Sequence, residues 1–142
     1  MIMPVLWVKD VDASIAFYNK LGFTTQMVLA GPAGKNVFGI VELGENNLGI
    51  STDDNPPASK VGAGVQFMIY LPDSTKIDDH YAASIAAGLE AKNLGTAYWG
   101  DRIYDVYDPD GYWITISQTV EQANMEKVAA VVRGDMPASH TN

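Results

Sequence analysis

The sequence predicts an α+β fold in which two β-α-β-β-β units follow one another and one further helix ends the chain. An internal repeat indicates the two units, because Val8 with Tyr18 recurs at the same spacing as Leu71 with Tyr81. Hydrophobic residues make up 47% of the 142 residues, enough to bury a core in a chain of this length. The polar, proline-containing stretch 52–60 is interpreted as the linker between the units.

In the first unit, residues 5–8 are apolar and rich in β-formers, which predicts a strand. Asp12 or Ser14 can cap a helix that runs to about Lys20 and ends at Gly22. The remaining predicted strands are 24–29, 37–43 and 48–51, of which the last two flank the hairpin signal 44–47.

The second unit repeats this order. Residues 65–71 form the first strand, and Ser74 is expected to cap a helix with Ile77, Tyr81 and Ile85 on its apolar side. Gly88 ends that helix. The remaining predicted strands are 91–94, 103–107 and 112–117, of which the last two flank the turn 108–111.

The domain organisation is therefore a first unit over 1–52, a second over 61–118 and a C-terminal amphipathic helix over 119–134, all in one structural domain. Thr119 and Gln122 have capping-box spacing, and Gly134 ends the helix. This helix packs on its own domain, contacts a second copy or covers a cleft. The tail 138–142 is expected to be disordered.

Two motifs give the sequence a family resemblance. They are F-Y-x-x-L-G-F at 17–23, preceded by V-K-D at 8–10, and D-P-D-G-Y-W at 108–113, preceded by W-G-D-R at 99–102. Over residues 3–118 the chain resembles the vicinal oxygen chelate superfamily of glyoxalase I, extradiol dioxygenases and bleomycin-resistance proteins. The resemblance implies that the two units curl into a partial barrel around a cleft, with the helices outside.

Strand alternation predicts which residues face that cleft. One side of each strand is uniformly aliphatic and should receive the helices, whereas the other mixes aromatic, methionine and small polar residues, as ligand sites do. A one-residue slip at the last hairpin would exchange Asp105 for Tyr104. The candidate ligand-binding residues are Met3, Val5, Trp7, Phe38, Ile40, Gln66, Met68, Tyr70, Trp99, Ile103, Asp105, Trp113 and Thr115.

Two assignments stay open. Trp and Tyr side chains in strands can equally serve packing. Arg102 either pairs with Asp101 or another carboxylate, or binds an anionic group of the ligand.

The metal ligands of the family that this chain resembles are missing from the sequence. The positions that the resemblance assigns to the metal carry Met3, Gly49, Gln66 and Thr115, of which only the amide could coordinate. His80 beside Asp78 and Asp79 is interpreted as part of a solvated face, and His140 lies in the tail. We therefore expect no metal and no cofactor, and assign no catalytic residue. Asp105 or Glu42 could in principle act as a base, without a paired acid or histidine nearby in sequence.

The favoured function is a binding protein that sequesters a hydrophobic or aromatic ligand such as an antibiotic, including a cationic one. The alternatives are a lyase, isomerase or dioxygenase-like enzyme of the same fold, and a domain that serves regulation or assembly. The net charge of −8 argues against nucleic acid as a partner, and no segment is long and apolar enough for a membrane span. The absence of cysteine excludes disulfides and thiolate chemistry. We expect a soluble cytoplasmic protein, and the resemblance implies a homodimer with clefts at the subunit interface.

Overall fold

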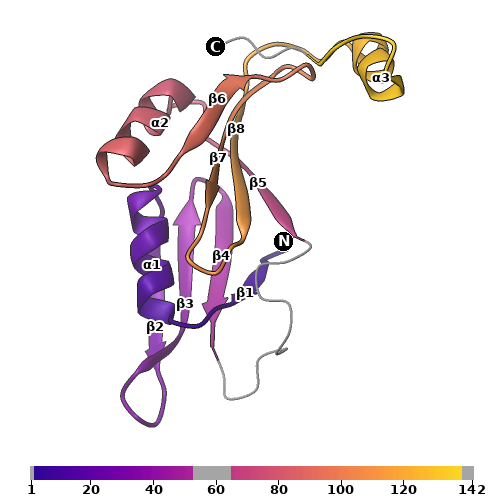
Figure 1. Ribbon diagram of the computed structural model, residues 1–142. Coiled ribbons are helices and arrows are strands. Elements are labelled where there is room, and N and C mark those ends of the chain that lie inside the picture. The colour runs from indigo at the N-terminus through magenta and orange to yellow at the C-terminus, as the bar shows by residue number, and fades with distance from the viewer. Residues whose placement is uncertain (1, 53–64, 139–142) are drawn as a thin grey trace.

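The computed structural model describes residues 2–52 and 65–138 (Figure 1). The predicted linker after Thr52 and the tail after Ala138 lie outside the described residues. The first unit comprises β1 (Val5–Trp7), α1 (Val11–Lys20), β2 (Thr24–Ala30), β3 (Asn36–Leu43) and β4 (Asn46–Ser51). The second comprises β5 (Gln66–Tyr70), α2 (Ile77–Ala86), β6 (Lys92–Thr96), β7 (Asp101–Tyr107) and β8 (Trp113–Thr119), and α3 (Met125–Arg133) follows.

Each unit forms one four-stranded mixed sheet, which confirms the predicted α+β class. The strand orders are β1-β4-β3-β2 and β5-β8-β7-β6, so the two sheets share one topology. In each, the first strand pairs in parallel with the last, and the other pairs are antiparallel. Neither sheet of the described chain closes into a barrel. No helix in the described ranges is long and apolar enough to cross a membrane.

The helix starts differ from those predicted. Asp10 caps α1, because its carboxylate accepts the Ala13 N–H at 3.1 Å. The predicted Ser74 cap is wrong, since α2 begins at Ile77 and makes no side-chain cap bond. The predicted start at Thr119 is also wrong, because that residue pairs with Asp101 at the end of β8. Instead, α3 begins after Asn124, stands apart from both sheets (Figure 1), and ends at Gly134 as predicted.

The aliphatic sides of both sheets are buried, as alternation predicts. Val41 and Ile50 of the first sheet and Val106, Ile114 and Ile116 of the second are at most 1% exposed. They belong to one continuous core that spans the two units. Because a shared core couples the units, the described chain is expected to unfold cooperatively.

A buried hydrogen bond joins the two units beside this core. Tyr18 of α1 donates its hydroxyl to the Asp108 carboxylate at 2.8 Å. That carboxylate also accepts the backbone N–H of Asp110 and Tyr112, each at 2.9 Å. Burial and the neighbouring Asp108 raise the pKa of Tyr18, so its hydroxyl stays protonated and donates. The D-P-D-G turn therefore connects the units as well as reversing the chain.

The interpretation of His80 as solvated is wrong. Its ring is partly buried, and Nδ1 lies 2.6 Å from the Tyr104 hydroxyl. Ser84 is buried beside the same hydroxyl, whereas Ile85, predicted to lie on the apolar side of α2, is 45% exposed. Nε2 faces Gly22 of the first unit, where a Cβ atom would lie only 2.9 Å away. Burial lowers the pKa of His80, partly opposed by the main chain of Leu21.

Candidate functional site

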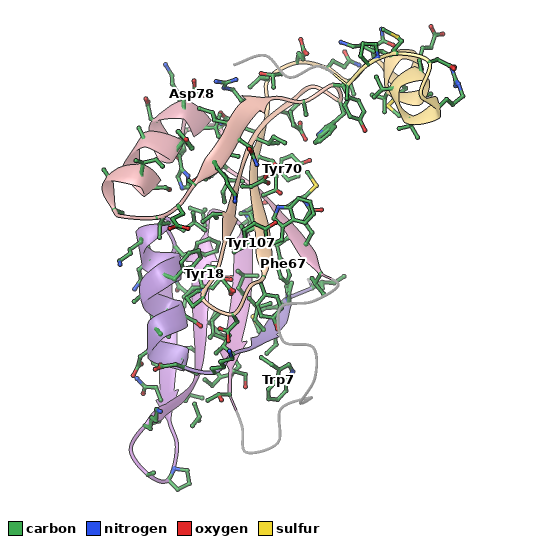
Figure 2. All side chains as sticks on the ribbon, viewed as in Figure 1. Trp7, Tyr18, Phe67, Tyr70, Asp78 and Tyr107 are labelled. Carbon is green, nitrogen blue, oxygen red and sulfur yellow. The ribbon has the colours of Figure 1, made fainter. Side chains whose placement is uncertain are left out.

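The side of the second sheet that faces away from the core is open. Strand register places Gln66, Trp113 and Tyr107 in one row across β5, β8 and β7. The next row contains Met68, Thr115 and Asp105, so the predicted register at the hairpin is the observed one. Figure 2 shows Tyr70 and Tyr107 beside this sheet. We call this surface the second open face; its exposed large side chains are Met68, Tyr70, Tyr107 and Trp113, between 38% and 50% exposed.

A hydrogen-bond network fixes Asp105 at the centre of the second open face. The Thr115 hydroxyl and the Trp113 indole N–H donate to its Oδ1 at 2.8 and 3.1 Å. The Asn93 amide donates to Oδ2 at 3.2 Å. Gln66 in turn donates to the Thr115 hydroxyl at 2.9 Å, so this hydroxyl accepts from one side and donates to the other. All of these residues except Asn93 are among the ligand-binding residues predicted from the sequence.

Two aromatic rings flank this network. The rings of Tyr107 and Trp113 are close to parallel, with an interplanar angle of 18° and centroids 6.4 Å apart. The Lys92 ammonium lies 5.6 Å from the centroid of the Tyr107 ring, within cation–π range. Because Trp113 is also held through its indole N–H, its ring is preorganised while remaining 38% exposed.

The second carboxylate on β7, Asp101, is buried and hydrogen-bonded by three neighbouring side chains. Asp101 accepts the Tyr70 hydroxyl at 2.7 Å, the Trp99 indole N–H at 3.0 Å and the Thr119 hydroxyl at 2.9 Å. Asp101 is only 5% exposed, so a ligand has little access to it. The bond to this carboxylate raises the pKa of Tyr70. Of the predicted ligand residues, Tyr70 and Trp99 are thus brought together through Asp101, while Ile103 beside them is buried.

The five predicted residues of the first unit lie on the corresponding side of the first sheet, which we call the first open face. Val5 and Ile40 lie on either side of Gly49, and Trp7 and Phe38 lie on either side of Ser51. The fifth, Met3, lies close to Gly49, because its Cε would be 3.6 Å from a Cβ atom there. Figure 2 shows Trp7 beside the first sheet.

The two units meet at a small pocket. Its volume is about 230 Å³, and it is lined by Ile2, Pro4, Glu45, Asn46, Asn47, Leu48, Phe67, Met68 and Ile69, of which Met68 belongs to the second open face. No side-chain hydrogen bond or ring contact within residues 2–52 and 65–138 joins the five first-unit residues to the Asp105 network.

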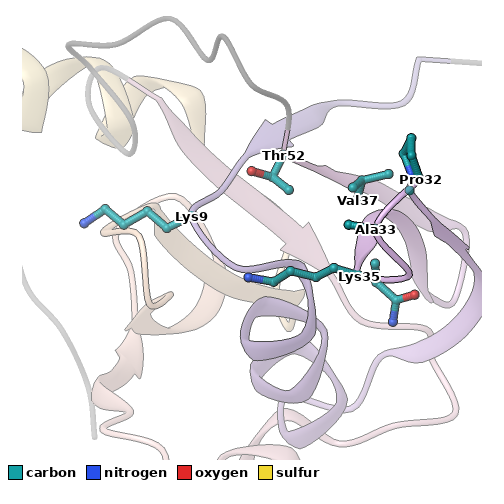
Figure 3. A pocket seen from close by; sticks show the side chains of 8 residues that line it. Lys9, Pro32, Ala33, Lys35, Val37 and Thr52 are labelled. Atoms are coloured by element: carbon teal, nitrogen blue, oxygen red, sulfur yellow. The ribbon is translucent and has the colours of Figure 1, made fainter.

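A separate pocket of about 540 Å³ was not anticipated from the sequence. It is lined by Lys9, Gly31, Pro32, Ala33, Lys35, Asn36, Val37 and Thr52. Figure 3 shows Lys9, Lys35 and Thr52 around it. Its wall comes from the turn before β3, whose conformation no periodic pattern in the sequence reports.

Arg102 pairs with a carboxylate, which is one of its two predicted roles. The partner is Asp78 of α2 rather than Asp101, with Nη2 3.1 Å from Oδ2 and Nε bonded to Oδ1. The guanidinium lowers the pKa of Asp78. Arg102 therefore links α2 to β7 on the helix-covered side.

The residues at the family's metal positions do not fit a divalent ion. Gln66 and Thr115 are bonded to each other, while Met3 and Gly49 offer no hard oxygen or imidazole ligand. Among the described residues, no three His, Asp or Glu side chains come together as a potential metal site.

Comparison with known proteins gives the family. The model of the Glyoxalase/Bleomycin resistance protein/Dioxygenase superfamily matches residues 2–116. The chain belongs to this superfamily. It is 26% identical to an uncharacterised protein of Mycobacterium bovis, over 92% of this chain and 91% of that protein.

Solved structures share the fold. A bleomycin-binding protein in complex with bleomycin has a TM-score of 0.61 and 23% identity, covering 83% of this chain and 97% of that one. TnmS3, an antibiotic-binding protein from Streptomyces sp. CB03234, has a TM-score of 0.64 and 20% identity, covering 82% and 93%. These likenesses show that the chain shares the fold of those proteins.

Proposed function

We propose that this protein binds a hydrophobic or aromatic small molecule, such as an antibiotic, on the second open face and does not convert it. The observation that carries the proposal is the half-exposed Trp113 ring, held beside Tyr107 and the Asp105 network. Two proteins of the same fold, a bleomycin-binding protein and the antibiotic-binding protein TnmS3, support it.

The energetics favour a planar ligand. A ring stacked on Trp113 gains about 0.5–1.5 kcal/mol for the aromatic pair in addition to the burial of apolar area. Because Trp113 is already fixed by its bond to Asp105, little side-chain entropy is lost on binding. Met68 is 42% exposed next to this ring row and offers adaptable apolar contact.

We also propose that a second copy completes the site, so that the protein works as a homodimer. One chain offers an open surface, whereas small-molecule sites bury about 70–90% of a ligand. The first open face of the second copy, with its apolar Val5, Ile40 and Phe38, would supply the opposite wall. Sedimentation as a monomer at concentrations that bind ligand would reject this part of the proposal.

The net charge and the shared core support proposals about partners, location and domain organisation. The net charge of −8 disfavours nucleic acid and anionic membrane surfaces as partners, and we propose a cytoplasmic protein acting as one structural domain.

The experiment is a titration of intrinsic tryptophan fluorescence with bleomycin and a panel of planar drugs. At least one compound should quench saturably in the wild type, and Trp113→Leu should weaken its binding about tenfold, the scale of one lost stacking contact. Ile85→Ala, at an exposed position on α2, serves as the control and should leave binding unchanged. No quenching by any compound would contradict the proposal. Turnover of a compound, or stoichiometric Mn, Fe, Ni or Zn in the purified protein, would favour an enzyme of this fold instead.

A further inference from the structure

We propose that Asp105 makes the second open face selective for a planar ring that carries a protonated nitrogen, over neutral or anionic rings of the same shape. This inference rests on the proposed function, because it specifies the charge of the ligand that binds beside Trp113. Three observations carry it: the donors bonded to the carboxylate are neutral, one of its oxygens has remaining acceptor capacity, and a cation already lies beside the adjoining ring.

Among the described residues, the Asp105 carboxylate is bonded only by neutral groups. Its three donors are a hydroxyl, an indole N–H and an amide. Within the described ranges, the two ion pairs are Arg102 with Asp78 and Arg133 with Asp135, so Asp105 is in neither. A partly buried carboxylate without a cationic partner attracts one, because its charge is only partly screened by water.

The network also leaves one place for a donor. Within residues 2–52 and 65–138, Oδ1 accepts from both Thr115 and Trp113, while Oδ2 accepts only from Asn93. Each carboxylate oxygen can accept two hydrogen bonds, so Oδ2 keeps one free lone pair. The Gln66 amide orients the Thr115 hydroxyl toward Asp105 and strengthens the bond that this hydroxyl donates, which fixes the carboxylate with Oδ2 still available.

Lys92 shows where a cation is stabilised on this surface. Its backbone pairs with that of Asp105 in the register of β6 with β7, so both side chains project on the same side. Its ammonium lies over the Tyr107 ring rather than in an ion pair with Asp105. A ligand cation would use the same electrostatic environment, and we expect the exposed Lys92 side chain to compete with it.

Asp101 sets the contrast for this assignment. Like Asp105, it accepts three neutral donors, here a Trp indole N–H and two hydroxyl groups. Unlike Asp105, it is buried, with 5% of its surface exposed. Asp105 combines a fixed carboxylate with access, so it is the carboxylate of β7 that a ligand can reach.

The test uses three probes with one ring system, at neutral pH and low salt: proflavine as the cation, acridine as the neutral ring and acridine carboxylate as the anion. Wild type should bind proflavine about tenfold more tightly than acridine, as expected for one charge-assisted hydrogen bond. Asp105→Asn should abolish this preference while acridine still binds. Lys92→Met should strengthen proflavine binding about twofold to fivefold, since a competing cation is removed.

Asp79→Asn is the matched control, because it changes the net charge equally at an exposed position of α2. It should leave the preference intact. Equal binding of proflavine and acridine by wild type, or weaker proflavine binding by Lys92→Met, overturns this inference and leaves the proposed function standing. Since the wild-type preference is measured without any variant, the inference is testable even if Asp105→Asn fails to fold. Binding of none of the three probes overturns the inference and counts against the proposed function as well.

Discussion

The two open faces have the same topology and different chemistry. In both sheets the first strand pairs in parallel with the last, and the same rows of side chains face away from the core. On the first open face Val5, Gly49 and Ile40 form an apolar row, whereas on the second the row of Asp105 carries a hydrogen-bonded carboxylate. Duplication thus supplies two equivalent frames, and the alternate residues on the strands decide what each can bind.

The largest expected effect concerns the D-P-D-G turn of the second unit, which is hydrogen-bonded to the first unit. Asp108→Ala should destabilise the chain by about 3–4 kcal/mol, because it leaves the buried Tyr18 hydroxyl and the two backbone N–H groups without an acceptor. Urea unfolding followed by fluorescence and circular dichroism should show one transition in both proteins. Asp73→Ala, at an exposed position, should change the stability by less than about 0.5 kcal/mol. Two separate transitions in the wild type would mean that the units are independent.

A pair of glycines extends the comparison to the turns. Gly100 has φ 97°, and a Cβ atom there would lie 2.4 Å from the Glu121 carbonyl oxygen, whereas Gly34 has φ 78° and open space around it. Gly34→Ala should cost about 1 kcal/mol for the left-handed backbone, and Gly100→Ala about 3 kcal/mol because the collision adds to that cost. If thermal denaturation shows equal losses of stability for the two variants, Glu121 is not packed against the turn at Gly100.

The polar and apolar faces should respond differently to conservative changes. Thr115→Val removes the hydroxyl between Gln66 and Asp105 and should cost about 1–2 kcal/mol. Ile40→Val on the first open face should cost at most about 0.5 kcal/mol, the low end for loss of one methylene group, because Ile40 is only partly buried. Chemical denaturation measures both. If the two variants lose the same free energy of unfolding, the hydrogen-bond network adds no stability beyond that of the apolar face.

The smallest expected effect is a pH dependence at the contact between α2 and Gly22. Burial lowers the pKa of His80 below its ordinary value of 6.5, so the unfolded chain binds this proton more readily than the folded one. Stability should therefore fall as the pH drops from about 7 through 6.5 toward the lowered pKa of the folded state. His80→Gln should flatten this part of the profile. An unchanged profile would exclude His80 as its source.

The sequence predicted much of the fold and the composition of the second open face. Alternation along β5 and β8 separates Ile69, Ile114 and Ile116 from Gln66 and Trp113, because a strand with one buried side has no other stable register. The D-P-D-G turn fixed the register of β7, which places Asp105 beside Thr115. Both signals are local, so a single sequence contains them.

The errors came from contacts between distant segments. The spacing of Thr119 and Gln122 matches a capping box, but the ladder with β7 and the bond from Thr119 to Asp101 keep that residue in β8. His80 has acidic neighbours in sequence, yet Tyr104 and Gly22 surround it in space. Asn93 joins the Asp105 network from a backbone with φ 63°, which no periodic pattern indicates.

The most direct test of binding at the second open face is the nuclear magnetic resonance spectrum of the three tryptophan indole N–H groups. On titration with proflavine, the indole signal of Trp113, assigned by its loss in Trp113→Leu, should shift the most and saturate. The Trp99 signal should move less, because that indole is bonded to the buried Asp101. Saturable binding that leaves the Trp113 signal in place would contradict the location of the site.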